Sequence, residues 1–600
     1  MYQTSDKYKT ESRQVIRNQS LLQVTFSVIE PDAADSATVE ASDTVDFADT
    51  RNVVYKSSTP YEYATLETNR FILDGSQVLL PESGFVYQGF VSTGISDDSG
   101  AFTDTPYLAF SFSQSFAFVG LTLRFSDHLD GDRPLEVTVK ASLSGKEKFS
   151  KSYAVTGQQL AISDAIPPME GEYVDKVTVY FNGTRIPNRR IRVIGVTFGV
   201  VLEFDNETIN SADWKRSISL ISTELPTESM SVSVIDTDKN FSPEKPQGIY
   251  AYLQERQPLN SRIGYELNNG SAEWIDVGAM YTTSGFSVDA NSSIPILSLE
   301  AQSTLLSLTE TWDKGKYVAG GRTFYDLAKE MLDGAELMHP QYVLSDRLKQ
   351  FTTTYPLPRD AIRNNLQLIA NACMCVLYTD RAGVIHITPP DETQLDYELS
   401  FNDVFSAPVT TKYPVLYTVT TEYSDITVDT GTSELTNIDI DHSTPTLTEI
   451  TYSMSTGQSI SADSGVTVTG EPTFYAEYCT CLLSGKGSVK INGKSITVNS
   501  NTVRKQYNTN GEDCPMSNKL ITSRAHAEAY ADWIAAFEKR RNEYEVEDRG
   551  YPEVDMADHI YLETAFTPKV SVQIVEHNIS FDGGISGSTK MIIAGGDADV

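Results

Sequence analysis

Short runs in which apolar and polar residues alternate recur along most of this chain, and Gly, Pro, Asn and Ser residues bound them. Leu22–Val28, written LQVTFSV, is one such run, and Ser229–Val234 is another. Alternation places one face of a strand in a core and the other in water, because successive side chains point to opposite sides. The pattern therefore predicts a mainly β fold with minor α+β content.

The segment 59–204 is predicted to be a separate β-sandwich. Turn residues such as Asp130-Gly131-Asp132 and Asn182-Gly183 are expected to connect its strands. The passage Asp32–Thr50 before it is acidic and rich in Ala, Ser and Thr, which is typical of a loop. The alternating positions that indicate the strands are Leu108, Phe110, Phe112, Leu121, Leu123, Phe125, Leu135, Val137, Val139, Val177, Val179, Ile191 and Val193, with Val196 out of step.

Further strands are predicted after the sandwich. Arg262–Leu267 and Glu273–Val277 flank Asn268-Asn269-Gly270-Ser271, which indicates a hairpin because Asn and Gly tolerate the positive φ of a tight turn. A short strand is expected at Ile296–Leu299. The tract 401–503 is rich in Thr, Ser and Val and shows almost no helical periodicity, so it is predicted to be β as well.

Helical spacing is clearest in three places. Thr323 is a plausible N-cap for a helix that Gly334 ends, and Asp360 is expected to cap a second helix. Together with a hairpin turned at 380–383, these helices predict a small α/β domain over residues 311–400. A third helix is predicted from Arg524 to Tyr544. Its expected buried stripe is Ala525, Ala529, Trp533 and Phe537, and that of the second helix is Ile362, Leu366, Ile369 and Cys373.

The charge of the chain restricts the partners it can bind. The 600 residues carry 81 acidic and 47 basic side chains, for a net charge of -34. Such a surface argues against binding to a phosphate backbone, which needs clustered Lys and Arg. The first residues, MYQTSDKYKTESRQ, are polar, so no secretory signal is visible. The most apolar stretch, Val193–Phe204, is too short to span a membrane, so no membrane insertion is expected.

The cysteines predict reduced thiols. There are five, an odd number, in a large chain: Cys373, Cys375, Cys479, Cys481 and Cys514. The two Cys-x-Cys pairs could suggest zinc, but structural zinc sites space their cysteines by two to four residues. A metal site is therefore not expected there.

No sequence pattern of a known catalytic site is present. The chain has no G-x-S-x-G, S-x-x-K, H-E-x-x-H or P-loop motif, and its histidines are scattered. Asp236–Asn240 resembles the start of a calcium loop, but Phe241 replaces the required glycine and Gln247 replaces the bidentate glutamate. We therefore expect no enzyme activity, no catalytic, cofactor-binding or metal-binding residues, and no cofactor.

One C-terminal stretch needs separate treatment. Residues 547–559, EDRGYPEVDMADH, hold five carboxylates and a histidine. They could form a metal or acid/base site, or a turn that leads into a strand. Gly550 and Pro552 favour a turn, and no second ligand cluster accompanies it. The stretch is predicted to be structural, with a strand through Ile560 and Leu562 that extends to Ala565, and with carboxylates that mostly face solvent.

The run QGIYAYLQERQPLNSRIGYELNNGSAEWIDVG, Gln247–Gly278, resembles the first domain of bacteriophage tail hub proteins, also called tail-tip or baseplate hub proteins. The matching pattern is R-x-G-Y-E-L, a Gly turn and E-W-I-x-x-G. Cys514–Thr522 is similar to the N-P-L-I passage of these hubs, with Lys519 where Pro is common. Arg549, Gly550, Pro552 and Asp558 match the R-G-x-P-x-x-x-x-x-D turn, and Asn492-Gly493-Lys494 the hairpin that precedes it.

The resemblance implies a domain organisation with two tail-tube-like β-barrel domains. Residues 1–58 would supply the first strands of one barrel domain and 205–310 the remainder, with 59–204 as an inserted galactose-binding-like β-sandwich. The small α/β domain would follow at 311–400, then a β-rich domain at 401–510. Residues 511–600 would form a helix and the second barrel-like domain.

For function, the resemblance implies a structural protein of the virion, at the tail tip, assembled in the cytoplasm of the host bacterium. Hubs of this kind are homotrimers whose two barrel domains per subunit match the six-fold tail tube. The implied partners are a distal tail or tail tube protein, the tape measure protein and tail fibre or tip proteins. The ring would close the distal end of the tube and open for DNA passage.

Two alternatives from other functional classes stay open. Residues 59–204 could bind a host-surface glycan as an adhesin, with Tyr87, Phe90, Phe102 and Tyr107 as rings that stack on sugars. Cell-wall hydrolysis is the other alternative. It is not expected, because only a short tail, SGSTKMIIAGGDADV, follows the last predicted strand.

Overall fold

The computed structural model describes most of the chain, and all structural statements concern these residues. They are 1–29, 36–42, 48–49, 53–54, 67–68, 70, 87–117, 120–126, 133–157, 159–162, 173–236, 256–283, 286–289, 295–335 and 340–594. Strands dominate, which confirms the predicted mainly β fold. Among the described residues, no helix combines the length and the apolar character that crossing a membrane requires.

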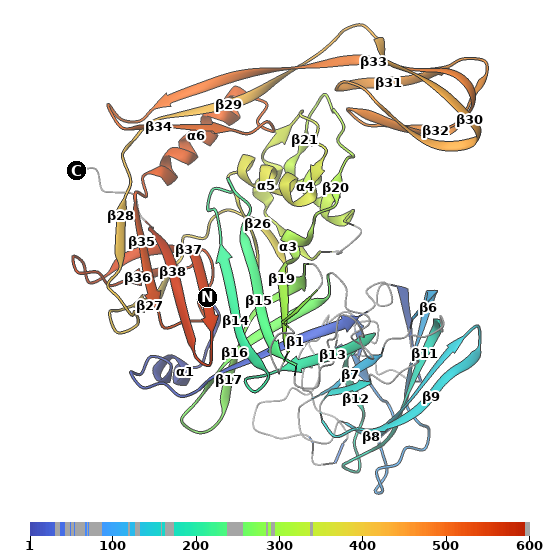
Figure 1. Cartoon of the computed structure of the whole chain (residues 1–600), viewed down its shortest axis with the longest axis vertical. Helices are drawn as coiled ribbons and strands as arrows, with labels where there is room; N and C mark the ends of the chain where they lie inside the picture. The colour runs from blue at the N-terminus through green and yellow to red at the C-terminus, as the bar shows by residue number, and fades with distance from the viewer. Residues whose placement is uncertain are drawn as a thin grey trace.

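A 14-stranded sheet runs through the centre of the molecule (Figure 1) and joins two β units. We call the strands from β13 to β14 along this sheet, with β18, the first β unit, and those from β37 to β28, with β36 and β27, the second β unit. In sheet order the strands are β13 (Gly199–Phe204), β1 (Ser20–Ile29), β16 (Pro258–Glu266), β17 (Ala272–Thr282), β19 (Ile296–Ser303), β15 (Thr227–Ile235), β14 (Ile209–Ser217), β37 (Val570–Phe581), β38 (Ile585–Ile593), β35 (Asn542–Asp548) and β28 (Val409–Lys412), while β18 (Ser287–Asp289) pairs with β19 and β36 (His559–Leu562) with β37 and β27 (Gln394–Leu399).

The contact between the two units is a backbone pairing. Strand β14 pairs antiparallel with β37, with Ala212 opposite Phe581 and Trp214 opposite Ile579. Ile579 and Phe581 belong to the second unit in sequence but pack into the core of the first, around the fully buried Trp214. Segments more than 350 residues apart therefore share one sheet and one core.

The predicted hairpin at 268–271 is confirmed between β16 and β17, with Gly270 at a φ of 81°. Residues of the R-x-G-Y-E-L and E-W-I-x-x-G patterns contact one another in this hairpin. Gly264 lies opposite Trp274, and a Cβ at Gly264 would come within 2.8 Å of the Trp274 ring. The Arg262 guanidinium stacks over the same ring at 4.6 Å from its centroid. Gly264 is therefore needed for space rather than for an unusual φ.

The segment between β1 and β13 forms a sandwich of two sheets around a shared core (Figure 1). Phe90 and Phe181, one from each sheet, stack at 5.8 Å between ring centroids. One sheet contains β2 (Ala37–Ala41), β6 (Tyr107–Ala117), β11 (Tyr173–Thr184), β8 (Pro134–Leu143) and β9 (Lys146–Ala154), the other contains β10 (Gln159–Ile162), β7 (Leu121–Phe125), β12 (Arg192–Thr197) and β5 (Phe90–Val91), and the short strands β3 (Ala48–Asp49) and β4 (Tyr87–Gln88) pair with each other.

The pairing moves both predicted limits of the sandwich, 59 and 204. Strand β2 joins the sandwich through β6, and β13 joins the large sheet through β1. The sandwich thus begins near residue 36 and ends near residue 198. Leu135 is 56% exposed, outside the predicted core face. The predicted turn Asn182-Gly183 lies inside β11, and the predicted turn at 130–132 lies outside the described residues.

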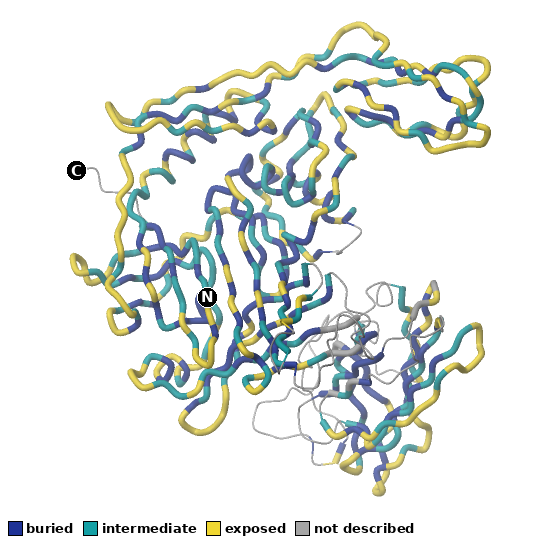
Figure 2. The backbone as a smooth tube through the Cα atoms, in the orientation of Figure 1, coloured by how far each residue is buried: buried dark blue, intermediate teal, exposed yellow. Residues whose placement is uncertain are grey.

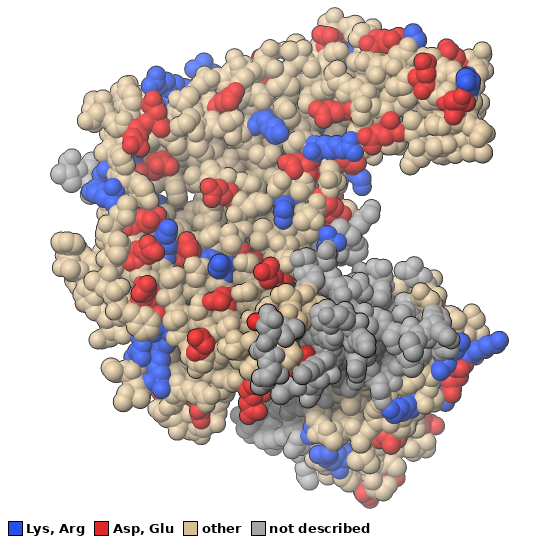
Figure 3. Space-filling view, in the orientation of Figure 1, with Lys and Arg blue, Asp and Glu red and all other residues tan. Residues whose placement is uncertain are grey.

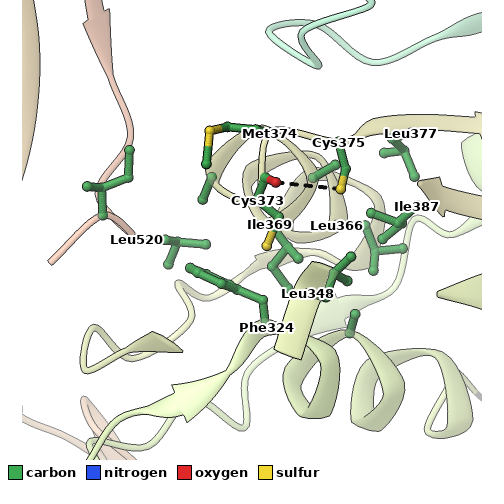
Figure 4. Packing of buried hydrophobic residues seen from close by; sticks show 14 of the residues in the cluster. Phe324, Leu348, Leu366, Ile369, Cys373, Met374, Cys375, Leu377, Ile387 and Leu520 are labelled. Carbon is green, nitrogen blue, oxygen red and sulfur yellow. Dashed lines mark hydrogen bonds between the residues drawn. The ribbon is translucent and has the colours of Figure 1, made fainter. Parts of the chain in front are cut away.

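A small α/β domain follows the first β unit and packs around one apolar core (Figure 4). Thr323 caps α4 as predicted, because its side chain accepts from the Asp326 N–H, and Gly334 ends that helix. The elements are α3 (Thr304–Ser307), β20 (Thr311–Trp312), β21 (Arg322–Thr323), α4 (Phe324–Asp333), β22 (Tyr342–Leu344), the 3-10 helix η3 (Asp346–Lys349), β23 (Thr352–Thr353), β24 (Asp360–Ala361), α5 (Ile362–Ala372), β25 (Val376–Thr379) and β26 (Ile385–Thr388).

Residues 416–517 form a long β arm that projects over the α/β domain (Figure 1). Its strands are β29 (Leu416–Val428), β30 (Ser433–Thr451), β31 (Ser455–Ala462), β32 (Val466–Phe474), β33 (Tyr478–Gln506) and β34 (Glu512–Ser517). Helix α6 (Arg524–Glu538) packs at the base of the arm, and the short helix α1 (Asp6–Glu11) lies near the N-terminus. Figure 2 shows that the arm is largely exposed apart from narrow buried rows.

Several local predictions were wrong. Asn492-Gly493-Lys494 is not a hairpin but the middle of β33, where Asn492 pairs with Glu434 on one side and Ser459 on the other. Gly493 is extended there, and its missing side chain leaves room for Leu435. The cap of α5 is Ala361, without a side-chain hydrogen bond, rather than Asp360.

The predicted helix at 524–544 was too long, and the prediction of its buried face was wrong. Helix α6 ends at Glu538 instead of Tyr544, because β35 begins at Asn542. Ala525 and Ala529 of the predicted stripe are exposed. The buried residues are His526, Ala527, Tyr530, Ala531, Ile534 and Ala535. An Ala-rich helix offers more than one apolar face, so the arm and the α/β domain decided which one is covered.

The strand pairing also redistributes residues among the predicted C-terminal domains. Strands β27 and β28, which fall within the predicted domains 311–400 and 401–510, belong to the sheet of the second β unit. Strand β34, from the predicted domain 511–600, belongs to the arm.

The motif hairpin supplies a first testable prediction. Gly264→Ala should lower the free energy of unfolding by about 1–2 kcal/mol, because the new Cβ forces the Trp274 ring to move. Gly278→Ala in the same hairpin is the control, since its Cβ would meet only Met280 at 3.4 Å. Scanning calorimetry should show a lower Tm for Gly264→Ala alone. Equal Tm values for both variants would contradict this explanation of the motif.

Candidate functional site

The stretch 547–559 lies at the junction of the two β units, and most of its carboxylates are not in solvent. Asp548 is fully buried and Glu553 is 4% exposed. Asp555 and Asp558 are intermediate, and only Glu547 is exposed. The prediction that these carboxylates mostly face water was therefore wrong. The predicted turn is present, and β36 follows it, although the strand ends at Leu562.

Gly550 forms the turn with a φ of 72°. A Cβ there would lie 2.1 Å from the Ile585 side chain, so both space and backbone conformation require glycine. Asp548 accepts hydrogen bonds from the Gly550 N–H at 2.8 Å and from the Thr589 hydroxyl at 2.5 Å. Burial raises the pKa of Asp548 to about 6. This carboxylate holds the turn against β38.

Glu553 ties the N-terminal segment to the second β unit. It accepts hydrogen bonds from the hydroxyls of Tyr8 at 3.0 Å and Tyr397 at 2.9 Å. The Arg13 guanidinium stacks on the Tyr397 ring at 4.3 Å. Burial, followed by the Glu553 charge, raises the pKa of both phenols, which keeps them protonated as donors. Arg17 adds a stack over Tyr551 at 5.0 Å.

A cluster of four charged residues, which we call the junction node, joins three parts of the fold. Asp555 accepts from the Arg381 Nε at 2.7 Å and lies 3.5 Å from Arg216. Arg216 also lies 3.5 Å from Glu228. Arg216 and Glu228 come from the first β unit, Arg381 from the α/β hairpin turn, and Asp555 from the second β unit. The node fixes these three parts against one another.

Burial and ion pairing shift the pKa values of the carboxylates in the junction node in opposite directions. Burial raises the pKa of Asp555, but the charges of Arg381, Arg216 and the N-terminal ammonium together outweigh it, and the net pKa is lowered. At Glu228, burial outweighs the attraction of Arg216 and raises the pKa to about 7. Glu228 is therefore only partly ionised near neutral pH.

The node was not predicted, although the sequence contains a signal for it. In β14, Ala212, Trp214 and Arg216 share the buried face, so a charged residue continues an apolar alternation. Glu228 lies on the buried face of β15, directly opposite Arg216. Two opposite charges in the inward phase of neighbouring strands indicate a buried pair, but their partners Arg381 and Asp555 are set by tertiary structure.

A cleft of about 870 Å³ opens beside the junction node, between the α/β hairpin and residues 555–559. His386 and Asp380 form a pair there at 2.9 Å, and the His386 ring stacks on Tyr378 at 4.8 Å. His559 lies at the wall of the cleft, 5% exposed, and burial lowers its pKa. Within the described ranges, no three His, Cys, Asp or Glu side chains gather closely enough to hold a metal ion.

The cysteines are packed into separate cores. Cys373 and Cys375 lie in the α/β core, where the Cys375 thiol donates to the Cys373 carbonyl at 3.6 Å (Figure 4). Burial raises the pKa of Cys375 to about 12, so it is a protonated, unreactive thiol. Cys479 and Cys481 belong to the core of the arm. The two Cys-x-Cys pairs are not brought together.

The residues considered for calcium and for glycan are only partly described. Of Asp236–Asn240, only Asp236 lies within the described residues, and it is 5% exposed. Phe90 is buried in the sandwich core, so it cannot stack on a sugar. Phe102 packs against the same core, and Tyr107 is partly covered by Tyr180 at 5.7 Å. The side chain of Tyr87 lies outside the described residues.

On the face of the molecule shown in Figure 3, Lys and Arg side chains are scattered among Asp and Glu rather than gathered in one patch. His577 is a buried residue of β37, where burial lowers its pKa to about 3, and its ring nitrogens contact Thr589 and the Tyr551 carbonyl. The charged and titratable groups at the junction thus hold chain segments together.

No protein-family model and no curated protein match this sequence. Solved structures with a similar arrangement include the 43 kDa tail protein of prophage MuSo2 from Shewanella oneidensis, with 11% identity and a TM-score of 0.39 over 66% of this chain and 96% of that one. A tail protein from Neisseria meningitidis has 8% identity and a TM-score of 0.36, covering 65% and 93%. Prophage tail protein gp18 from Listeria monocytogenes has 8% identity and a TM-score of 0.34, covering 65% and 91%.

Glu228 should make stability depend on pH. Because its pKa in the folded chain lies above the usual 4.5, its proton is bound more tightly in the folded state. Stability from this group is present at about pH 4.5 and is lost as pH rises through about 7, by up to about 3 kcal/mol. Glu228→Gln should remove this loss, whereas exposed Glu224→Gln should keep it. Denaturation of the three proteins at several pH values measures the slopes, and parallel slopes would refute the assignment.

Removing the central carboxylate of the junction node should be costly. Asp555→Ala leaves Arg381 and Arg216 without this partner, so we expect a loss of about 3 kcal/mol in unfolding free energy. Asp333→Ala breaks an ion pair with Lys329 whose side chains are about half exposed, and should cost less than about 1 kcal/mol. Thermal unfolding of both variants makes the comparison, and similar losses would show that the node contributes no more than a surface pair.

Proposed function

We propose that this chain is a structural hub of a bacteriophage or prophage tail. One observation carries the proposal. Two β units lie side by side and share one 14-stranded sheet through β14 and β37, whose paired residues are more than 350 positions apart in the sequence. A homotrimer of such chains would present six β units around an axis, which is the symmetry of a tail tube.

Two of the matched motifs support this proposal, because they form parts of the paired units. The R-x-G-Y-E-L and E-W-I-x-x-G strands are β16 and β17 of the first unit. The R-G-x-P turn carries the junction contacts of the second. In the proposed assembly, the hub closes the distal end of the tail tube and meets the tube protein, the tape measure protein and the tip or fibre proteins.

The charge of the chain also fits a part that DNA passes. A net charge of -34 repels phosphates, so DNA could move through the proposed ring without adhering. The contacts found at the junction are structural, and the proposal includes no enzymatic step. The chain would be made and assembled in the host bacterium and would remain in the virion at the tail tip.

Antibody labelling of intact tails tests the proposal directly. Gold particles against this chain should lie at the distal end of the tail in electron micrographs, and mass photometry of the purified chain should give a species of about three times 66.3 kDa. Images of that species should show a ring with a central channel. Label along the whole tail or on the capsid would overturn the hub assignment, as would tails that lack the chain.

A further inference from the structure

A small cavity lies where the N-terminal segment meets both β units. Its volume is about 10 Å³, which is close to the space that a single water molecule or monatomic ion fills. Ser12 and Arg17 line it from the N-terminal segment, Tyr265 from β16, and Tyr551 from the turn after β35. We call this space the junction cavity. A particle bound in it lies between three parts of the fold.

Arg17 brings an unused edge of its guanidinium to the junction cavity. Its Nη1 donates to the Arg549 carbonyl at 2.7 Å, and its guanidinium lies 5.0 Å from the centroid of the Tyr551 ring. Its Nε and Nη2 are buried and have no hydrogen-bond partner among the described residues. These two groups point along the same edge of the guanidinium, which is an edge that binds anions in a bidentate manner.

Ser12 supplies a third unpaired donor. It is 4% exposed, and its hydroxyl is buried without a hydrogen-bond partner in the described part of the chain. Its backbone is fixed at the end of α1, where the Ser12 N–H donates to the Tyr8 carbonyl at 2.9 Å. Buried polar groups in folded proteins nearly always have a partner, so three unpaired donors at one cavity indicate a bound particle.

No direct ion pair balances the charge of Arg17 within the described chain. The buried carboxylates of this region are bound to other donors. Glu553 accepts from the Tyr8 and Tyr397 hydroxyls, and Asp548 accepts from its own turn and from β38. A partly buried cation without a counter-ion is unfavourable, because the protein interior solvates charge poorly. An anion in the junction cavity would supply the missing charge.

The loop that carries Arg17 is held in place from outside. The Arg549 guanidinium donates to the carbonyls of Gln14 and Val15, both at 3.0 Å, while Arg17 donates back to the Arg549 carbonyl. This reciprocal contact fixes the direction of the unpaired Arg17 edge. The site is therefore formed before any ligand arrives, which lowers the cost of binding.

We propose that the junction cavity binds a chloride ion, held by the Nε–H and Nη2–H groups of Arg17 and by the Ser12 hydroxyl. A water molecule has a suitable size, but it would leave the Arg17 charge unbalanced. Phosphate, sulfate and carboxylate groups are too large for about 10 Å³. The bound ion makes the docking of the N-terminal segment onto both β units depend on chloride. This inference goes beyond the proposed hub and does not rest on it.

Hydrogen exchange of the full chain at several chloride concentrations, measured by mass spectrometry, tests the proposal. Gluconate, an anion too large for the cavity, keeps the ionic strength constant, so that screening does not change. Once chloride exceeds its dissociation constant, each tenfold increase should slow exchange by local opening of residues 5–20 about tenfold. Peptides from the arm, residues 455–474, should show no change in the same samples.

Three variants locate the effect. Arg17→Gln removes the charge and should abolish the chloride dependence, and Ser12→Ala removes one donor and should raise the chloride concentration needed for protection. Arg524→Gln is the matched control, because Arg524 is an exposed arginine of α6 that pairs only with Glu528 among the described carboxylates. Circular dichroism checks that each variant is folded.

Protection of residues 5–20 that rises with chloride, is lost in Arg17→Gln and persists in Arg524→Gln would support the proposal. Protection that does not depend on chloride in the wild-type chain would overturn it and assign the cavity to water. A response that Arg17→Gln retains would overturn it as well, because chloride would then act elsewhere. If Arg17→Gln releases the segment in every buffer, Ser12→Ala decides, and an unchanged chloride response in that variant would reject the site.

Discussion

The pairing of β14 with β37 is the contact on which the rest of the structure depends. It joins the two β units by backbone hydrogen bonds and places Ile579 and Phe581 in the core around Trp214. Shear between the units would break a strand ladder and open a core together. The relation between the units is therefore a property of one sheet rather than of a flexible linker.

Buried charged residues at the junction determine how the two β units are oriented against each other. Arg216 contacts two carboxylates, and Asp555 contacts Arg216, Arg381 and the N-terminal ammonium, so the packing of the three parts pairs all four side chains of the junction node. Such clusters contribute little net stability when compared with an apolar core, since burial of charge is costly. In this chain, the node selects one arrangement of the first β unit, the second β unit and the α/β hairpin.

The sandwich is accommodated without disturbing this arrangement. It begins after β1 and ends at β13, and these two strands are paired, with Ile29 opposite Gly199. The ends of the inserted segment therefore lie side by side, and the large sheet closes beneath it as if a short hairpin were present. This explains how a segment of that size can interrupt a β unit, since its length adds little to the cost of closing the sheet.

The sequence by itself determined the strands, because alternation of apolar and polar residues is a local pattern. Its period of two residues fixes which face of each strand is buried. It also determined the α4 cap, the Asn-Gly hairpin at 268–271 and the Gly550 turn, which depend on single residues and their neighbours. Tertiary structure decided which edges meet, which face of α6 is covered and where the sandwich begins. It also turned Asn492-Gly493 into mid-strand residues and buried the carboxylates of 547–559. These outcomes depend on partners hundreds of residues away, such as Tyr8 for Glu553 and Arg381 for Asp555, and no local pattern encodes such partners.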